Sequence, residues 1–116
     1  EQVGILLSND AGEMATIALT LHAKQPKRGT IAYDKGYIEL YEYPRGQKAV
    51  ITYTEDGSQE VIEAGETAKA LSYEVADMEK AVAGIENTMH LGYTQDVMDI
   101  MTQLRKEWGL VYPEEV

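Results

Sequence analysis

The sequence predicts an α+β fold: a mostly antiparallel sheet of about six strands, followed by two helices that pack on one face of the sheet. Three observations lead to this class. Residues 14–23 alternate between two unlike faces with a period of two, which is typical of a strand. Apolar residues between positions 71 and 85 recur at spacings of four and three, which is typical of an amphipathic helix. All the strand-like segments come before the helical ones, so strands and helices are segregated along the chain.

The first half of the chain reads as strands joined by short turns. Glycine, proline, asparagine and aspartate mark the breaks, because these residues suit the backbone of tight turns. The dipeptide Lys35-Gly36 is expected to turn one hairpin. The expected strands are residues 4–8, 14–23, 30–34, 37–43, 47–54 and 59–63.

The second half reads as two helices with recognisable ends. Ser72 is the candidate N-cap of the first helix, which should end near Gly84. Thr94 is the candidate N-cap of the second helix, Gly109 should end it, and Pro113 prevents it from resuming. The second helix is expected to bury one apolar stripe against the sheet, made of Val97, Met101, Leu104 and Trp108.

Composition narrows the classes of protein and partner. A chain of 116 residues is long enough for one domain with a core. It contains no cysteine, which excludes disulfides and thiolate chemistry and favours a reducing, cytoplasmic setting. The net charge of −10 disfavours nucleic acid and anionic membrane surfaces. Apolar runs stay shorter than the roughly 18 residues that a membrane span needs.

The sequence offers no self-contained set of catalytic groups. The ten glycines are spaced so that neither the G-x-G-x-x-G fingerprint nor the phosphate-binding loop can occur. The two histidines, His22 and His90, fall in different elements, and neither has a second histidine at ligand spacing. No serine sits in a nucleophile elbow. We therefore expect no catalytic, cofactor-binding or metal-binding residue in this chain.

The sequence has eight tyrosines and no phenylalanine, and several tyrosines fall on one side of an expected strand. The helices can cover only one face of the sheet, and a tyrosine ring suits a surface that is buried on assembly. The alternative is that these rings are solvated and are favoured by strand propensity alone. The candidate interface of a homo-oligomer is Tyr37, Tyr41 and Tyr43, with Tyr33 and Tyr53 as further candidates on the same side.

The chain resembles the C-terminal domain of the glucose–fructose oxidoreductase, inositol dehydrogenase and MocA (Gfo/Idh/MocA) family of two-domain, NAD(P)-dependent oxidoreductases. The likeness covers nearly all of the chain and is structural rather than catalytic. Tyr33 departs from it, because the family commonly has the first glycine of a hairpin there. The segments that carry the resemblance are "GILLSNDAGEMATIALTLHA", "GTIAYDKGYIEL", "YEVADMEKAVAGIEN" and "GYTQDVMDIMTQLRKEWGLVYP".

The resemblance implies a role within a larger enzyme. Residues 1–116 would form a single C-terminal substrate and oligomerisation domain of a longer protein, whose N-terminal Rossmann domain holds NAD or NADP and the catalytic residues. The parent reaction would transfer hydride between the nicotinamide and a hydroxyl or carbonyl of a sugar, cyclitol or diol. The chain alone would then be inactive.

Two other functions fit the same residues. The main alternative is a stand-alone α+β interaction module that dimerises through its open sheet face. A weaker one is a small-molecule sensor that uses a concave sheet, which would need a pocket with convergent polar groups.

Overall fold

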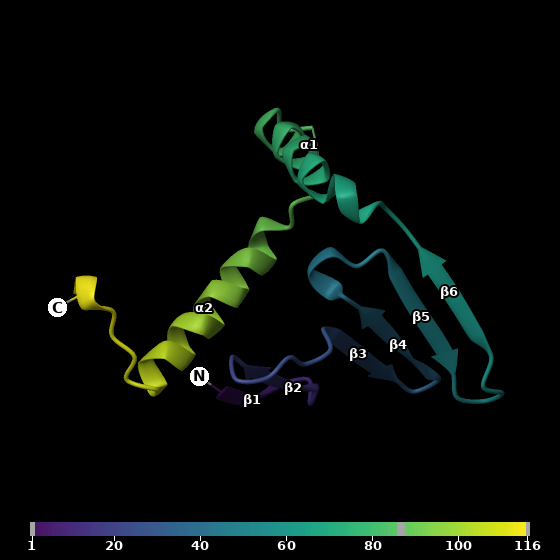
Figure 1. The fold of residues 1–116 in the computed structure, drawn as a ribbon, viewed down its shortest axis with the longest axis horizontal. Coiled ribbons are helices and arrows are strands. Elements are labelled where there is room, and N and C mark those ends of the chain that lie inside the picture. The colour runs from purple at the N-terminus through teal and green to yellow at the C-terminus, as the bar shows by residue number, and fades with distance from the viewer. Residues whose placement is uncertain (1, 86–87, 116) are drawn as a thin grey trace. The chain divides into compact units, whose positions relative to one another are not determined.

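The computed structural model describes residues 2–85 and 88–115. The chain forms two compact units, Glu1–Thr67 and Ala68–Val116, and each is described by itself. The first unit holds the strands and the second holds the helices (Figure 1). The predicted α+β class is therefore confirmed. The expected organisation as one domain and the packing of helices on a sheet face stay predictions.

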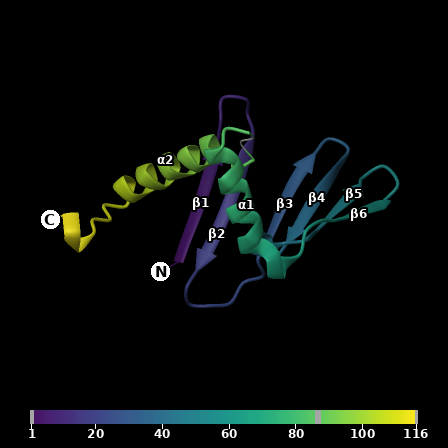
Figure 2. The same ribbon diagram turned by 90° about the horizontal axis from the view of Figure 1, so that it is seen from above.

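Six antiparallel strands occur in the described part of the first unit, as expected, but they form two sheets rather than one. β1 and β2 make a two-stranded sheet, and β3 to β6 make a four-stranded sheet in chain order (Figure 2). The strands are β1 Gln2–Ser8, β2 Met14–Thr20, β3 Arg28–Tyr33, β4 Gly36–Tyr41, β5 Lys48–Tyr53 and β6 Gln59–Glu63.

The hairpin of β1 and β2 is closed by a turn that Asn9 organises. The Asn9 side-chain oxygen accepts a hydrogen bond from the Glu13 amide at 3.0 Å, and Gly12 takes the positive φ of 82° that the turn needs. Paired residues of the two strands share a face, which gives one apolar face. That face comprises Val3, Ile5, Leu7, Ala15, Ile17 and Leu19.

The hairpin of β3 and β4 turns at residues 34 and 35, so the expected turn at Lys35-Gly36 is wrong by one position. Gly36 is the first residue of β4 and pairs with Tyr33 on one side and Tyr53 on the other. A Cβ on Gly36 would overlap the carbonyl oxygen of Thr52 and lie 3.2 Å from its carbonyl carbon. Glycine is required here by the close approach of β5 rather than by the turn.

The four-stranded sheet has two unlike faces. The register places Ile31, Ile38 and Ile51 in one row across three strands. The side chains that share their side form the isoleucine face: Ile31, Tyr33, Ile38, Leu40, Ala49, Ile51, Tyr53, Glu60 and Ile62. The opposite side alternates with it and carries most of the charged residues of the sheet. We call this side the mixed face, and it includes Arg28, Tyr37, Glu39, Tyr41, Lys48, Thr52, Gln59 and Glu63.

The second unit contains α1, Ala70–Val82, and α2, Leu91–Glu107. The N-terminal caps predicted at Ser72 and Thr94 are wrong, because both residues lie inside the helices and neither flanking residue makes a side-chain cap. α2 begins after His90, whose backbone is left-handed and whose carbonyl accepts the Tyr93 amide at 2.9 Å.

The predicted helix ends are confirmed. Gly84 and Gly109 follow the two helices with positive φ values of 69° and 63°. After α2, the amides of Gly109 and Leu110 donate hydrogen bonds to the carbonyls of Lys106 and Arg105, at 3.1 and 3.0 Å respectively. Such bonds satisfy the last carbonyl groups of a helix, and a residue without a Cβ adopts the required conformation at little cost.

No apolar side chain is buried among the described residues, and Thr52, at 9% exposure, is the single buried polar one. The apolar stripe expected on α2 exists, and its burial against the sheet stays a prediction, because each unit is described by itself. Val97, Met101 and Trp108 are 53%, 57% and 52% exposed, and Leu104 is half-buried. Elements of both units therefore carry exposed apolar side chains.

Candidate interaction surfaces

The structure brings only two of the three candidate interface tyrosines together. Tyr37 and Tyr41 share the mixed face of β4. Tyr43 has left the strand and lies in a short 3₁₀ helix, Tyr43–Arg45, after Glu42 takes a left-handed backbone with φ of 51°. The predicted place of Tyr43 beside Tyr41 is wrong because the strand ends at Tyr41, so the alternation of side chains does not continue to residue 43.

The two further candidates, Tyr33 and Tyr53, lie on the opposite side of the sheet, so their expected place beside Tyr37 is wrong. Both pair with Gly36, which shares the side of Ile38. The aromatic side chains are therefore divided between the two faces rather than gathered on one.

The mixed face is polar around its tyrosines. Arg28 Nη1 lies 3.6 Å from Glu39 Oε1, and this pair joins β3 to β4. Gln59 Nε2 donates to Thr52 Oγ1 at 3.1 Å, which joins β6 to β5. Interfaces between proteins often combine aromatic rings with such a polar rim. The role of Tyr37 and Tyr41 as an interface stays a prediction.

The isoleucine face is the more apolar side of the sheet. Ile31 and Ile62 lie on the two edge strands and are 56% and 46% exposed, and each pairs with an aliphatic residue of the neighbouring strand. At the β6 edge the Tyr53 hydroxyl donates to Glu60 Oε2 at 3.2 Å, and this bond to a carboxylate raises the pKa of Tyr53. The candidate interface predicted from the tyrosines does not include this face. The alternation of Ile38 and Leu40 was the signal for it.

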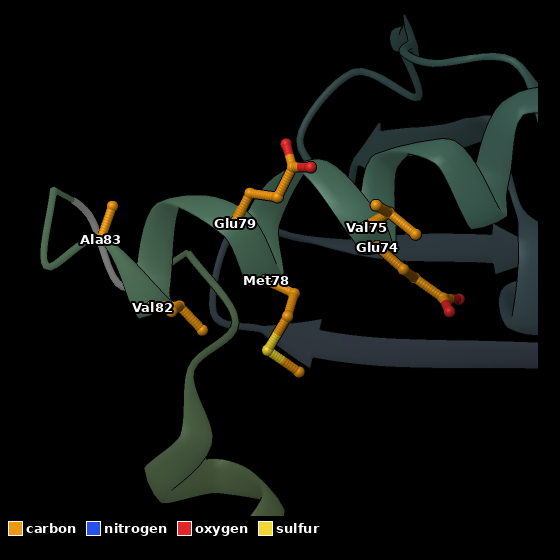
Figure 3. Close-up of a pocket in the computed structure, with 6 residues that line it drawn as sticks. All are labelled: Glu74, Val75, Met78, Glu79, Val82 and Ala83. Atoms are coloured by element: carbon orange, nitrogen blue, oxygen red, sulfur yellow. The ribbon is translucent and has the colours of Figure 1, made fainter.

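A shallow apolar hollow of about 560 Å³ runs along α1 (Figure 3). All of the residues that line it come from α1 and the residue that follows it, so no second element encloses a small molecule there. Its lining is Glu74, Val75, Met78, Glu79, Val82 and Ala83. The hollow is therefore a helix face, with aliphatic side chains and two carboxylates beside them.

A salt bridge between Arg105 and Glu115 holds the C-terminal segment against the last turn of α2. Arg105 Nη1 lies 2.6 Å from both carboxylate oxygens of Glu115, and the Tyr112 amide donates to Glu115 Oε2 at 3.2 Å. The Arg105 guanidinium also lies 5.2 Å from the centre of the Tyr112 ring. The hydrogen bond from Arg105 lowers the pKa of Glu115, and the same bond raises the pKa of Arg105.

The pair gives the C-terminal segment a pH dependence with a definite sign. Because the folded-state pKa of Glu115 is lowered, the pairing is present above the ordinary pKa of a glutamate, about 4.3, and is lost as pH falls through the lowered value. In an acid titration followed by NMR, we expect the ring signals of Tyr112 to move as Glu115 protonates. Glu115→Gln should give the acid-state signals at neutral pH, whereas the control Glu114→Gln should not. Tyr112 signals that ignore both acid and Glu115→Gln would contradict the pairing.

The two histidines stand at element ends. His22 follows β2, and its amide donates to Thr20 Oγ1 at 3.0 Å. His90 precedes α2, and its ring stacks on Tyr93 with 5.4 Å between ring centres. Across residues 2–85 and 88–115, no cluster of three or more potential ligand side chains could hold a metal ion. In the same residues, neither helix has the length and apolar character to cross a membrane.

Comparison of the chain with protein-family models, with curated proteins and with solved structures finds no match. The resemblance to the Gfo/Idh/MocA oxidoreductases therefore stays an interpretation of the sequence motifs. The features that the structure itself contributes are surfaces: the isoleucine face, the apolar face of the β1–β2 hairpin and the apolar sides of both helices.

Proposed function

We propose that this chain is the oligomerisation and substrate domain of an NAD(P)-dependent oxidoreductase, and that assembly with further copies covers part of its apolar surface. One observation carries the assembly role. Among the described residues the apolar side chains are exposed or only half-buried, including those that share a face or a stripe. Contiguous exposed apolar surface of this kind marks sites of association in soluble proteins.

An uncovered apolar face is unfavourable in water. Removing apolar surface from water contributes about 25 cal/mol per Å². Ile31, Ile62 and Ile17 are all between 39% and 56% exposed although each lies among other apolar side chains. A second polypeptide placed on these surfaces would bury them together, and this gain would drive the association.

The enzyme class is supported by the resemblance alone. It implies a parent enzyme that transfers hydride between NAD or NADP and a sugar, cyclitol or diol, with the cofactor supplying the chemistry. The present chain contains no dinucleotide fingerprint, so in this proposal it contributes a wall of the substrate pocket and the contact between subunits.

A stand-alone interaction module remains the second candidate, and Tyr37 and Tyr41 on the mixed face favour it. Both candidates require association, and they differ in whether a nucleotide-binding domain belongs to the same polypeptide. A coding sequence with a G-x-G-x-x-G segment in the same reading frame upstream would select the oxidoreductase.

Thermal unfolding at a series of protein concentrations tests the assembly role. Association stabilises the folded state by mass action, so the Tm of an assembling chain rises with its concentration.

A further inference from the structure

We infer that the outer edge of β2 pairs antiparallel with β2 of a second copy, so that two β1–β2 hairpins join into one four-stranded sheet. The inference deepens the proposed assembly role and rests on it. The partner on this edge is a second copy of this chain.

The first observation is that the hairpin stands as a separate two-stranded sheet. Figure 2 shows β1 and β2 as a ribbon pair that is distinct from the β3–β6 sheet. An isolated two-stranded hairpin is at best marginally stable in water, and three or more strands are needed for independent stability. The hairpin therefore gains most from further strands at its edges.

The second observation is that its strands lack the residues that usually protect an edge. Charged side chains and prolines keep edge strands from pairing with other chains. The edge strands of the other sheet carry such charges, with Arg28 in β3 and both Glu60 and Glu63 in β6. β1 and β2, seven residues each, carry none. Although the chain as a whole is acidic, the β2 strands of the two copies would therefore meet without charge repulsion.

Exposure selects β2 rather than β1 as the pairing edge. Val3, Ile5 and Leu7 of β1 are half-buried, whereas nearly every residue of β2 is exposed. On the shared apolar face, Ile17 and Leu19 of β2 are 39% and 51% exposed. A strand added beside β2 would cover side chains that β1 does not cover.

The backbone groups on this edge can be identified from the turn. The Asn9 amide donates to the Glu13 carbonyl at 3.2 Å, so this pair is hydrogen-bonded across the hairpin. Bonded and non-bonded pairs alternate along antiparallel strands, so the odd-numbered residues of β2 bond to β1. The backbone groups that point outward belong to Met14, Thr16, Ala18 and Thr20.

Symmetry and charge then fix the register. β2 runs from Met14 to Thr20, so its midpoint is Ile17, and an antiparallel pairing centred there matches all seven residues of both copies. The acidic turn before one strand, with Asp10 and Glu13, then runs beside the segment after the other strand, which carries Lys24. The two ends of the interface are thus complementary in charge.

A cysteine at the symmetry centre tests the register directly. The chain has no native cysteine. In the inferred pairing two copies of residue 17 form a non-hydrogen-bonded pair, with Cα atoms about 4.5 Å apart, within the range that a disulfide spans. We expect Ile17→Cys to give a covalent dimer on oxidation. The control Ile5→Cys lies on the same face but three strand spacings from its counterpart, roughly 14 Å, and should stay uncrosslinked.

A charge exchange tests the same edge without a covalent bond. In the inferred register Thr16 lies opposite Ala18 of the second copy. The double variant Thr16→Lys with Ala18→Lys places lysines opposite each other at two positions, and we expect loss of the dimer in sedimentation. Thr16→Lys with Ala18→Asp should retain a dimer of twice 12.9 kDa, which also shows that the hairpin tolerates both sites. Thr30→Lys with Ala32→Lys on β3 is the matched control and should leave the dimer intact.

The outcomes separate this inference from the proposed function. An Ile17→Cys chain that stays monomeric on oxidation, while the unmodified chain still associates, overturns the β2 pairing and leaves the assembly role standing. The β2 pairing is overturned in the same way if β3 of the same chain forms hydrogen bonds with the outer edge of β2. Retention of the dimer by the double lysine variant overturns the pairing as well. An unmodified chain that is monomeric at every concentration overturns both.

Discussion

Replacing Gly36 by alanine is expected to lower the free energy of unfolding by about 3 kcal/mol, because the new methyl group has no room. A Cβ there would overlap the Thr52 carbonyl oxygen and lie 3.2 Å from the Cα of Tyr53. These are backbone atoms of the neighbouring strand, so they can move only if β5 separates from β4. Denaturation in urea, followed by far-ultraviolet circular dichroism, measures the loss.

The matched control is Gly29→Ala in β3. Gly29 also lies in a strand of the same sheet, but a Cβ there meets no atom within 4 Å. Its φ is not positive, so alanine reduces the entropy of the unfolded chain without strain, and stability should stay the same or rise by about 0.5 kcal/mol. Equal effects of the two substitutions would contradict the close approach of β5 to Gly36.

Replacing Ile51 by aspartate is expected to lower the free energy of unfolding by about 3 kcal/mol and to weaken association. Ile51 is half-buried in the middle of the isoleucine face, where it pairs with Ile38 on one side and Glu60 on the other. The substitution removes an aliphatic group from the face and places a second carboxylate opposite Glu60. The loss follows whether helices of the same chain or another copy cover this face. Urea denaturation and light scattering measure the two effects.

Val61→Asp on the mixed face is the control. Val61 is a β-branched residue of the same sheet, is 51% exposed and lies on the side that already carries charged residues. We expect its substitution to cost less than half as much as that of Ile51. If Val61→Asp were the more damaging of the two, the mixed face rather than the isoleucine face would be the one that assembly buries.

The sequence predicted the elements well where one local rule determines them. Strand alternation located β2 because each step of the chain reverses its side, although Leu21 and Ala23 fall beyond the strand end. Gly84 and Gly109 located the helix ends because the backbone after each helix is left-handed, and glycine adopts this conformation more readily than residues with a Cβ. The N-terminal caps failed because serine and threonine are also tolerated inside helices, and both helices begin before them.

The faces of the sheet could be predicted only in part, because they depend on register as well as alternation. Tyr37 and Tyr41 share a face as expected, since both lie within β4. Tyr33 joins the isoleucines because the turn at residues 34 and 35 sets the pairing of β3 with β4. Tyr53 joins them because the connection at residues 42–47 sets the pairing of β5 with β4. The need for Gly36 likewise depends on β5, which is distant in sequence, so no local pattern could reveal it.

The most direct test of the assembly role is the thermal unfolding of the unmodified chain over a wide range of concentrations. Covering exposed apolar surface by association links stability to concentration, so we expect Tm to rise steadily as the protein becomes more concentrated. The half-exposed side chains of the isoleucine face and of β2 would be covered in the associated state. A Tm that is the same at the lowest and highest concentrations, in a chain that stays monomeric throughout, would contradict the assembly role.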